Sequence, residues 1–204
     1  MHQLLNTCNA DVCNKIGVNC LLENEFRPQL YGGKKITKCF RFSSDAMSEL
    51  ESEAQRKEIS LNSLVNGLII EYLEWGRFIE RYGGLSFSET SFASLVRETG
   101  DISIFEKAGA EAGIKTPRRL LLMLGLSCSK ENVLLLVDII CEHSISYQRY
   151  VHRLIDGKHN FLLVHNLGFK MSGWFGGYIR SMFKDLLGLE IKVTEDDDSI
   201  SFVV

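Results

Sequence analysis

The sequence lacks the short patterns that identify the common enzyme classes. It contains no Gly-x-Ser-x-Gly, no glycine loop of the kind that cradles a phosphate, and no His-Glu-x-x-His. Catalysis needs a nucleophile, a base or a metal in a defined arrangement, and each of these patterns would supply one. We therefore expect a protein that is not an enzyme and that carries no cofactor.

Closely spaced cysteines and long apolar runs are also lacking. The six cysteines include no Cys-x-x-Cys pair, the usual sign of a zinc ribbon or a redox centre. No apolar run reaches the roughly 18 residues that cross a bilayer, and the first residues lack the basic-then-apolar order of a secretion signal. We expect a cytoplasmic protein with reduced thiols and no membrane partner.

An excess of positive charge is the third feature that the sequence lacks. Its 23 Lys and Arg residues and 26 Asp and Glu residues give a formal net charge of −3. This total does not point to nucleic acid, but a small basic surface can be hidden inside it. Charge must therefore be analysed segment by segment.

The segment between Lys34 and Phe42 is basic and free of acids. Aliphatic and aromatic side chains alternate there with polar or small ones, which is the period of a β-strand. Its four cations are Lys34, Lys35, Lys38 and Arg41. We expect the polar face of this strand to bind an anion. The preceding residues 1–33 have no sustained periodicity, and we interpret them as a mobile arm.

Two amphipathic helices are expected after the strand. Ser43-Ser44-Asp45 are good capping residues and precede a short helix that stops near Lys57. Ser60-Leu61-Asn62-Ser63 supplies a second cap, and apolar residues follow it at helical spacing toward Arg81. Gly83-Gly84 then ends this longer helix.

A strand and two helices of this size need a second copy of the chain. A lone strand has no pairing partner, and about 42 residues are too few to make a core of their own. In a dimer, two such strands can form an antiparallel ribbon above four helices. A two-stranded ribbon fits the major groove of DNA, and the start of each second helix offers backbone amides to a phosphate.

In these residues the chain resembles the ribbon-helix-helix family of transcriptional regulators. The resemblance covers Lys34 to Trp75, and we assign residues 34–82 to a dimeric domain that binds double-stranded DNA. The DNA-binding residues that it implies are Lys35, Thr37, Lys38, Cys39 and Arg41 in the strand and Ser60, Leu61, Asn62 and Ser63 at the second cap. Thr37, Cys39 and Arg41 take the base-reading positions.

The sequence departs from the family in two respects. The family often has a proline where Ser43 stands and a glycine where Glu58-Ile59 stand. Cys39 is an unusual base-reading residue because a thiol is a weak hydrogen-bond partner, so we expect a modest sequence preference. The alternative is an amphipathic helical hairpin that serves only for dimerisation.

Residues 85–204 are predicted to form one α+β domain that oligomerises or senses an effector. Helical patterns cover residues 91–113 with a break at Gly100, begin again at Thr116-Pro117, and begin a third time at Ser129. Two strands flank the turn Asp156-Gly157, and a second hairpin closes the chain. Between the hairpins, a helix spans Phe169–Leu187. Its three glycines favour close helix packing over a ligand pocket.

Histidines in this second domain suggest a weaker hypothesis, a sensor of metal ions. Borderline metals such as zinc favour nitrogen and sulfur ligands. The candidate ligands are Cys141, His143, His152 and His165. A histidine near a turn is more often hydrogen-bonded within the protein than bound to a metal.

Two functional classes therefore stay open. The first is a transcriptional regulator with a C-terminal domain for oligomerisation or sensing. The second is a protein-interaction module, an antitoxin-like dimer whose C-terminal domain engages a partner protein. The length of that domain favours the regulator, because a partner-binding tail can be much shorter and disordered before it binds.

Overall fold

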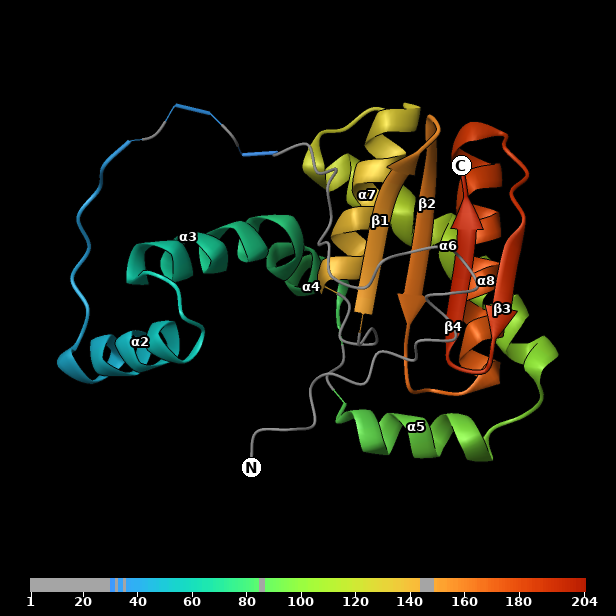
Figure 1. Ribbon diagram of the computed structural model, residues 1–204, viewed down its shortest axis with the longest axis horizontal. Coiled ribbons are helices and arrows are strands. Elements are labelled where there is room, and N and C mark those ends of the chain that lie inside the picture. Colours follow the sequence, from blue (N-terminus) through green and yellow to red (C-terminus); the bar gives the residue numbers. More distant parts are fainter. Residues whose placement is uncertain (1–29, 32, 35, 85–86, 144–148) are drawn as a thin grey trace.

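Four antiparallel strands form one sheet, and helices cover one of its faces (Figure 1). The computed structural model describes residues 30–31, 33–34, 36–84, 87–143 and 149–204. The strands are β1 (Arg149–Ile155), β2 (Lys158–Val164), β3 (Val193–Asp196) and β4 (Ser199–Val203), in the order β1-β2-β4-β3. The predicted α+β class with two hairpins is confirmed.

The first hairpin turns at Asp156 and Gly157, as the sequence predicts. The two residues have positive φ angles of 51° and 74°, as a two-residue type I′ turn requires. The second hairpin joins the first by pairing β4 with β2, so that Asn160 lies opposite Val203. No sequence pattern predicted this pairing, which turns two hairpins into a single sheet.

The helices lie where apolar spacing places them, with one exception described below. They are α2 (Ser44–Arg56), α3 (Leu61–Glu71), α4 (Arg77–Tyr82), α5 (Glu89–Glu98), α6 (Ile102–Leu124), α7 (Lys130–His143) and α8 (Phe169–Leu187). A π-helical turn, η1 (Tyr72–Gly76), joins α3 to α4, so the chain stays helical from Leu61 to Tyr82. Within the described part of the chain, no helix has both the length and the apolar character that membrane crossing requires.

The exception is the predicted helix start at Thr116-Pro117, which is wrong. Helix α6 continues through both residues to Leu124. A proline inside a helix removes one backbone hydrogen bond and usually bends or ends the helix. Here Pro117 is buried, and the contact of α6 with α8 is the most extensive between any two elements. Tertiary packing therefore outweighs the local preference for a helix start.

Glycines bring the backbones of α6 and α8 into direct contact. A Cβ atom on Gly109 would lie 2.0 Å from the carbonyl oxygen of Trp174, and one on Gly113 would lie 2.3 Å from that of Tyr178. From the other side, a Cβ atom on Gly177 would lie 2.4 Å from the carbonyl oxygen of Glu106. The prediction of close packing by the α8 glycines is confirmed.

The main core lies between this helix pair, α7 and the inner face of the sheet. Phe161 and Leu163 of β2 point into it, and the ring of Phe161 stacks on Phe202 of β4 with centroids 4.6 Å apart. Phe183 of α8 is fully buried against the same sheet face. Leu162, between Phe161 and Leu163, belongs to a separate small cluster on the opposite face.

His165 links the end of β2 to the start of α8. It is fully buried, its Nδ1 accepts a hydrogen bond from the backbone N–H of Leu167, and its Nε2 lies 3.1 Å from Ser172 Oγ. Ser172 Oγ donates in turn to the carbonyl oxygen of Asp196 in β3. Burial lowers the pKa of His165 to about 4, although the charge of Asp198 opposes the shift. This histidine is therefore neutral at pH 7.

Replacing Gly109 by alanine tests the backbone contact between α6 and α8. The new methyl group would overlap a main-chain carbonyl that cannot move away, so we expect the free energy of unfolding to fall by about 2–3 kcal/mol. Urea denaturation measures the change. The control is Gly67→Ala on α3, where a Cβ atom has no neighbour within 4 Å. We expect that variant to gain about 0.5–1 kcal/mol from helix propensity, and equal stability of the two variants would contradict the packing argument.

Acid should weaken the contribution of His165 to stability. The unfolded chain binds a proton at this residue near pH 6.5, whereas the folded chain binds it only near pH 4. Between these values the unfolded state holds more protons, so the free energy of unfolding falls as pH falls. The variant His165→Asn lacks this titration. We expect the stability difference between parent and variant to stay constant from pH 8 to pH 7.5 and to shrink toward pH 4.5 in urea titrations. If the difference in free energy of unfolding between parent and variant stays constant down to pH 4.5, the neutral, buried state of His165 is excluded.

Candidate nucleic-acid interface

Helices α2 and α3 project away from the sheet and its covering helices (Figure 1). We call residues 36–71, which comprise these helices and the segment before them, the arm. The arm is anchored through η1 and α4, where Phe78 is buried in the main core. Trp75 stacks on His143 of α7 with centroids 6.4 Å apart, and His143 Nε2 lies 3.1 Å from Glu74 Oε2. One continuous helical stretch thus connects the arm to the core.

Serines begin both helices of the arm, as the sequence predicts. Ser43 Oγ accepts a hydrogen bond from the backbone N–H of Ala46 at the start of α2, and Ser60 Oγ accepts one from Ser63 at the start of α3. Each bond satisfies an amide that the helix itself leaves without a partner. The other amides of the first turn of α3 have no acceptor within their own helix, which is the usual basis of phosphate binding at such a position.

The basic segment before α2 is exposed along its described length. Residues 36–43 form no helix or strand in the single chain. Thr37, Lys38, Cys39 and Arg41 are all exposed, and Lys35 lies outside the described residues. The N-terminal segment predicted to be mobile, residues 1–33, also lies almost wholly outside the described residues. Strand pairing between two copies stays a prediction, because a single chain does not test it.

Three of the four predicted DNA-binding residues at the start of α3 are exposed. Ser60, Asn62 and Ser63 are exposed, whereas Leu61 is partly buried beneath the first turn of α3. The hydroxyl groups of Ser60 and Ser63 lie 2.8 Å apart and hydrogen-bond to each other. The exposed side of this turn is therefore polar, and Leu61 contributes only its backbone amide to any contact there.

The four candidate metal ligands do not meet. Cys141 is buried, and burial raises the pKa of its thiol well above the usual range, which disfavours the thiolate that metals bind. His143 lies against Glu74, His152 against Asp138, and His165 against Ser172. Among the residues that the structure describes, no group of three or more histidine, cysteine or acidic side chains is arranged to hold a metal ion. The metal-sensing hypothesis therefore loses its proposed ligand set.

Sequence reasoning missed a buried acid that connects α7 to the first hairpin. Asp138 is 2% exposed, its Oδ1 accepts a hydrogen bond from the hydroxyl of Tyr150, and the same oxygen lies 2.8 Å from His152 Nδ1. The contacts continue outward, with His152 Nε2 2.9 Å from His159 Nδ1. Burial raises the pKa of Tyr150 far above its usual range, so it keeps its proton as donor. The one available sequence signal was an acid inside an otherwise apolar helix.

Comparisons with known proteins add no family to these observations. The chain matches no protein-family model, no curated protein and no solved structure. The resemblance to ribbon-helix-helix regulators therefore stays a prediction from the sequence.

Proposed function

We propose that this chain is a DNA-binding transcriptional regulator that acts as a homodimer. The basic segments of two copies pair as an antiparallel ribbon, and the ribbon enters the major groove with Thr37, Cys39 and Arg41 toward the bases. One observation carries the proposal. An exposed segment that combines large apolar side chains with Lys38 and Arg41, and contains no acid, stands beside two capped helices.

The apolar side chains of the arm support dimerisation. Ile36, Phe40 and Phe42 are 76%, 69% and 49% exposed, and large apolar groups that cluster on a surface favour association. The second helix, α3, adds Leu68 and Ile69, each nearly half exposed. A second copy would cover both sets, because its strand pairs with the first strand and its helices lie below the ribbon.

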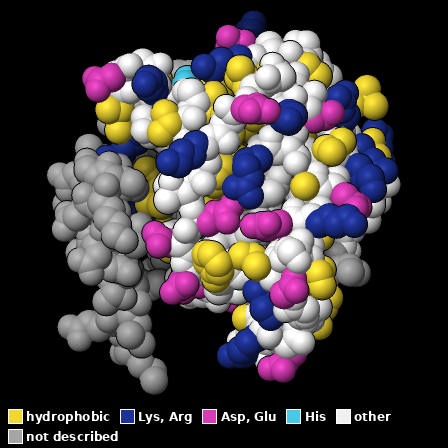
Figure 2. All heavy atoms as spheres, turned by 90° about the vertical axis from the view of Figure 1, so that its right-hand side faces the viewer, with side chains coloured by type: hydrophobic (Ala, Val, Ile, Leu, Met, Phe, Trp, Pro, Cys, Tyr) yellow, Lys and Arg dark blue, Asp and Glu magenta, His cyan; other side chains and the backbone are white. Residues whose placement is uncertain are grey.

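The charge pattern supports an anionic partner. Figure 2 shows that cations and acids are interspersed on one side of the molecule, which is typical of a solvated surface. The segment from Lys34 to Arg41, in contrast, carries four cations and no acid. DNA is an anionic partner whose groove admits a two-stranded ribbon, so charge and shape agree.

The turn between α2 and α3 also fits the family pattern. Glu58 has a φ angle of 55°, in the left-handed region that glycine adopts most easily. The ribbon-helix-helix family often has a glycine at this place. A positive φ angle at this turn is consistent with the proposal, because a glycine would adopt it readily.

The remaining question is the role of the sheet and its covering helices. We assign them oligomerisation or effector sensing, in a regulator whose arm binds DNA. The alternative is an antitoxin-like dimer in which the same part of the chain engages a partner protein. Binding to duplex DNA that weakens steeply with salt distinguishes the regulator from a module that acts only on proteins.

Dimerisation through the ribbon predicts that a charge at Phe40 separates the subunits. In analytical ultracentrifugation we expect the parent chain of 23.1 kDa to sediment as a dimer and Phe40→Glu as a monomer. The physical reason is that two glutamates would face each other in the interior of the dimer. Ile104→Glu is the control, because Ile104 is 56% exposed on α6, outside the arm. A dimer that survives Phe40→Glu would argue against the ribbon.

Base reading by Arg41 predicts a loss of DNA affinity when it is removed. Duplexes selected from a random-sequence pool by the parent chain serve as the probe, and fluorescence anisotropy gives the affinity. We expect Arg41→Ala to cost about 1–3 kcal/mol. Arg97→Ala, which removes another exposed arginine, on α5, is the matched control and should bind like the parent. Equal affinity of Arg41→Ala and Arg97→Ala would rule out the assigned role.

A further inference from the structure

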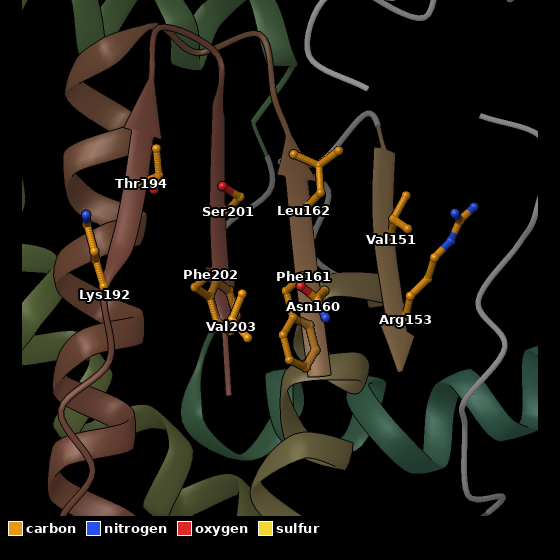
Figure 3. A pocket seen from close by; sticks show the side chains of 10 residues that line it. All are labelled: Val151, Arg153, Asn160, Phe161, Leu162, Lys192, Thr194, Ser201, Phe202 and Val203. Atoms are coloured by element: carbon orange, nitrogen blue, oxygen red, sulfur yellow. The ribbon is translucent and has the colours of Figure 1, made fainter. Parts of the chain in front are cut away.

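The face of the sheet opposite the helices carries a pocket that the proposed DNA binding does not use. The pocket has a volume of about 350 Å³, and side chains from strands β1, β2 and β4 and from the β3 edge line it (Figure 3). Strand pairing explains why these side chains meet. The register places Val151 beside Leu162, Leu162 beside Ser201, and Ser201 beside Thr194, in one row across the sheet.

A second row lies next to the first on the same face. The register places Arg153 beside Asn160 and Asn160 beside Val203, and Lys192 follows in line just before β3. In Figure 3 these side chains stand on the same side of the sheet as Thr194 and Leu162. Alternate residues of a strand point to one face, so the two rows form a continuous lining.

The first row of the lining changes from apolar and buried at its β1 end to polar and exposed at its β3 end. Val151 and Leu162 are only 5% and 3% exposed, although they lie on the face away from the main core. Lys192 and Thr194, on the far side of the sheet, are exposed, and Ser201 lies between these two environments. A ligand that enters from the β3 side would meet polar groups first and apolar groups deeper in.

The charged groups of the pocket are all positive. Among the described residues that line the pocket, Arg153 and Lys192 are charged, and none is an acid. Arg153 already interacts within the protein. Lys192 forms no ion pair with the described residues, and its ammonium group is exposed at the polar end. This lysine is therefore the cation best placed to meet a ligand.

We propose that this pocket binds a small organic anion with an apolar body. The apolar body lies over Val151 and Leu162, while a carboxylate, sulfonate or phosphate group pairs with Lys192 and accepts hydrogen bonds from the hydroxyls of Thr194 and Ser201. The volume is at the lower end of the range found for small-molecule sites, which are typically about 300–1,000 Å³. The proposal is independent of the arm, because no residue of the arm lines the described pocket.

The test uses two fluorescent probes that differ in one charged group. The anionic probe is 8-anilinonaphthalene-1-sulfonate, and the neutral probe is N-phenyl-1-naphthylamine, which has the same aromatic body without the sulfonate. We expect saturable binding of the anionic probe to the full chain. Lys192→Gln should weaken this binding about tenfold, the usual effect of one charge-assisted hydrogen bond, and should leave binding of the neutral probe unchanged.

Two further variants show where the probe binds. Ser201→Phe should abolish binding of both probes, because a ring in the middle of the first row fills the pocket. Lys115→Gln is the matched control, since Lys115 is an exposed lysine on α6, a helix that lies on the other side of the sheet from the pocket. Circular dichroism of each variant confirms that it is folded. Two outcomes would overturn the proposal. One is that Lys192→Gln and Lys115→Gln change the affinity for the anionic probe equally. The other is that folded Ser201→Phe binds the probes as well as the parent chain does.

Discussion

Helices α6 and α8 lie so close together that their backbones touch, and the positions of the other elements follow from this contact. The glycines at 109, 113 and 177 leave no room for a side chain, so each helix lies in a groove of the other. Helix α8 then positions the sheet: Ser172 bonds to the backbone of β3, and Arg180 pairs with Glu195 at 2.6 Å. The same contact keeps α6 continuous through Pro117. One helix pair therefore determines where the sheet lies and how its outer face is presented.

The arm differs from the rest of the molecule in how it places its apolar side chains. The body of the molecule has a main core between its helices and the sheet, whereas in the arm Phe40 is 69% exposed and Leu68 and Ile69 are each nearly half exposed. A helical stretch that begins in the arm ends against α7, where Phe78 and Trp75 contact the main core. This continuous helical connection sets the direction in which the arm leaves the body. The exposed apolar groups of the arm are the ones that the proposed dimer would bury.

Local patterns in the sequence were sufficient for most elements and for part of the candidate interface. The caps at Ser43 and Ser60, the turn at Asp156-Gly157 and the helix over Phe169–Leu187 were all predicted, because each depends on residues close together in the chain. The metal ligands were not. His152 and His165 were grouped by their spacing, but one contacts Asp138 and the other Ser172, and no local pattern indicates such partners. The proposed ribbon involves a second chain, and the contacts between two chains are not a local property of the sequence.

The sequence by itself determined which segments are helical, which are extended, and where an acid-free basic stretch lies, because periodicity, capping and charge are local properties. Only the tertiary structure decided that α6 is one helix, that β2 pairs with β4, and that Leu162 and Lys192 line the same pocket. These outcomes depend on contacts between residues far apart in the chain. Their energies come from packing and from strand pairing across the molecule, and such terms outweigh local preferences of about 1 kcal/mol wherever a buried surface is large.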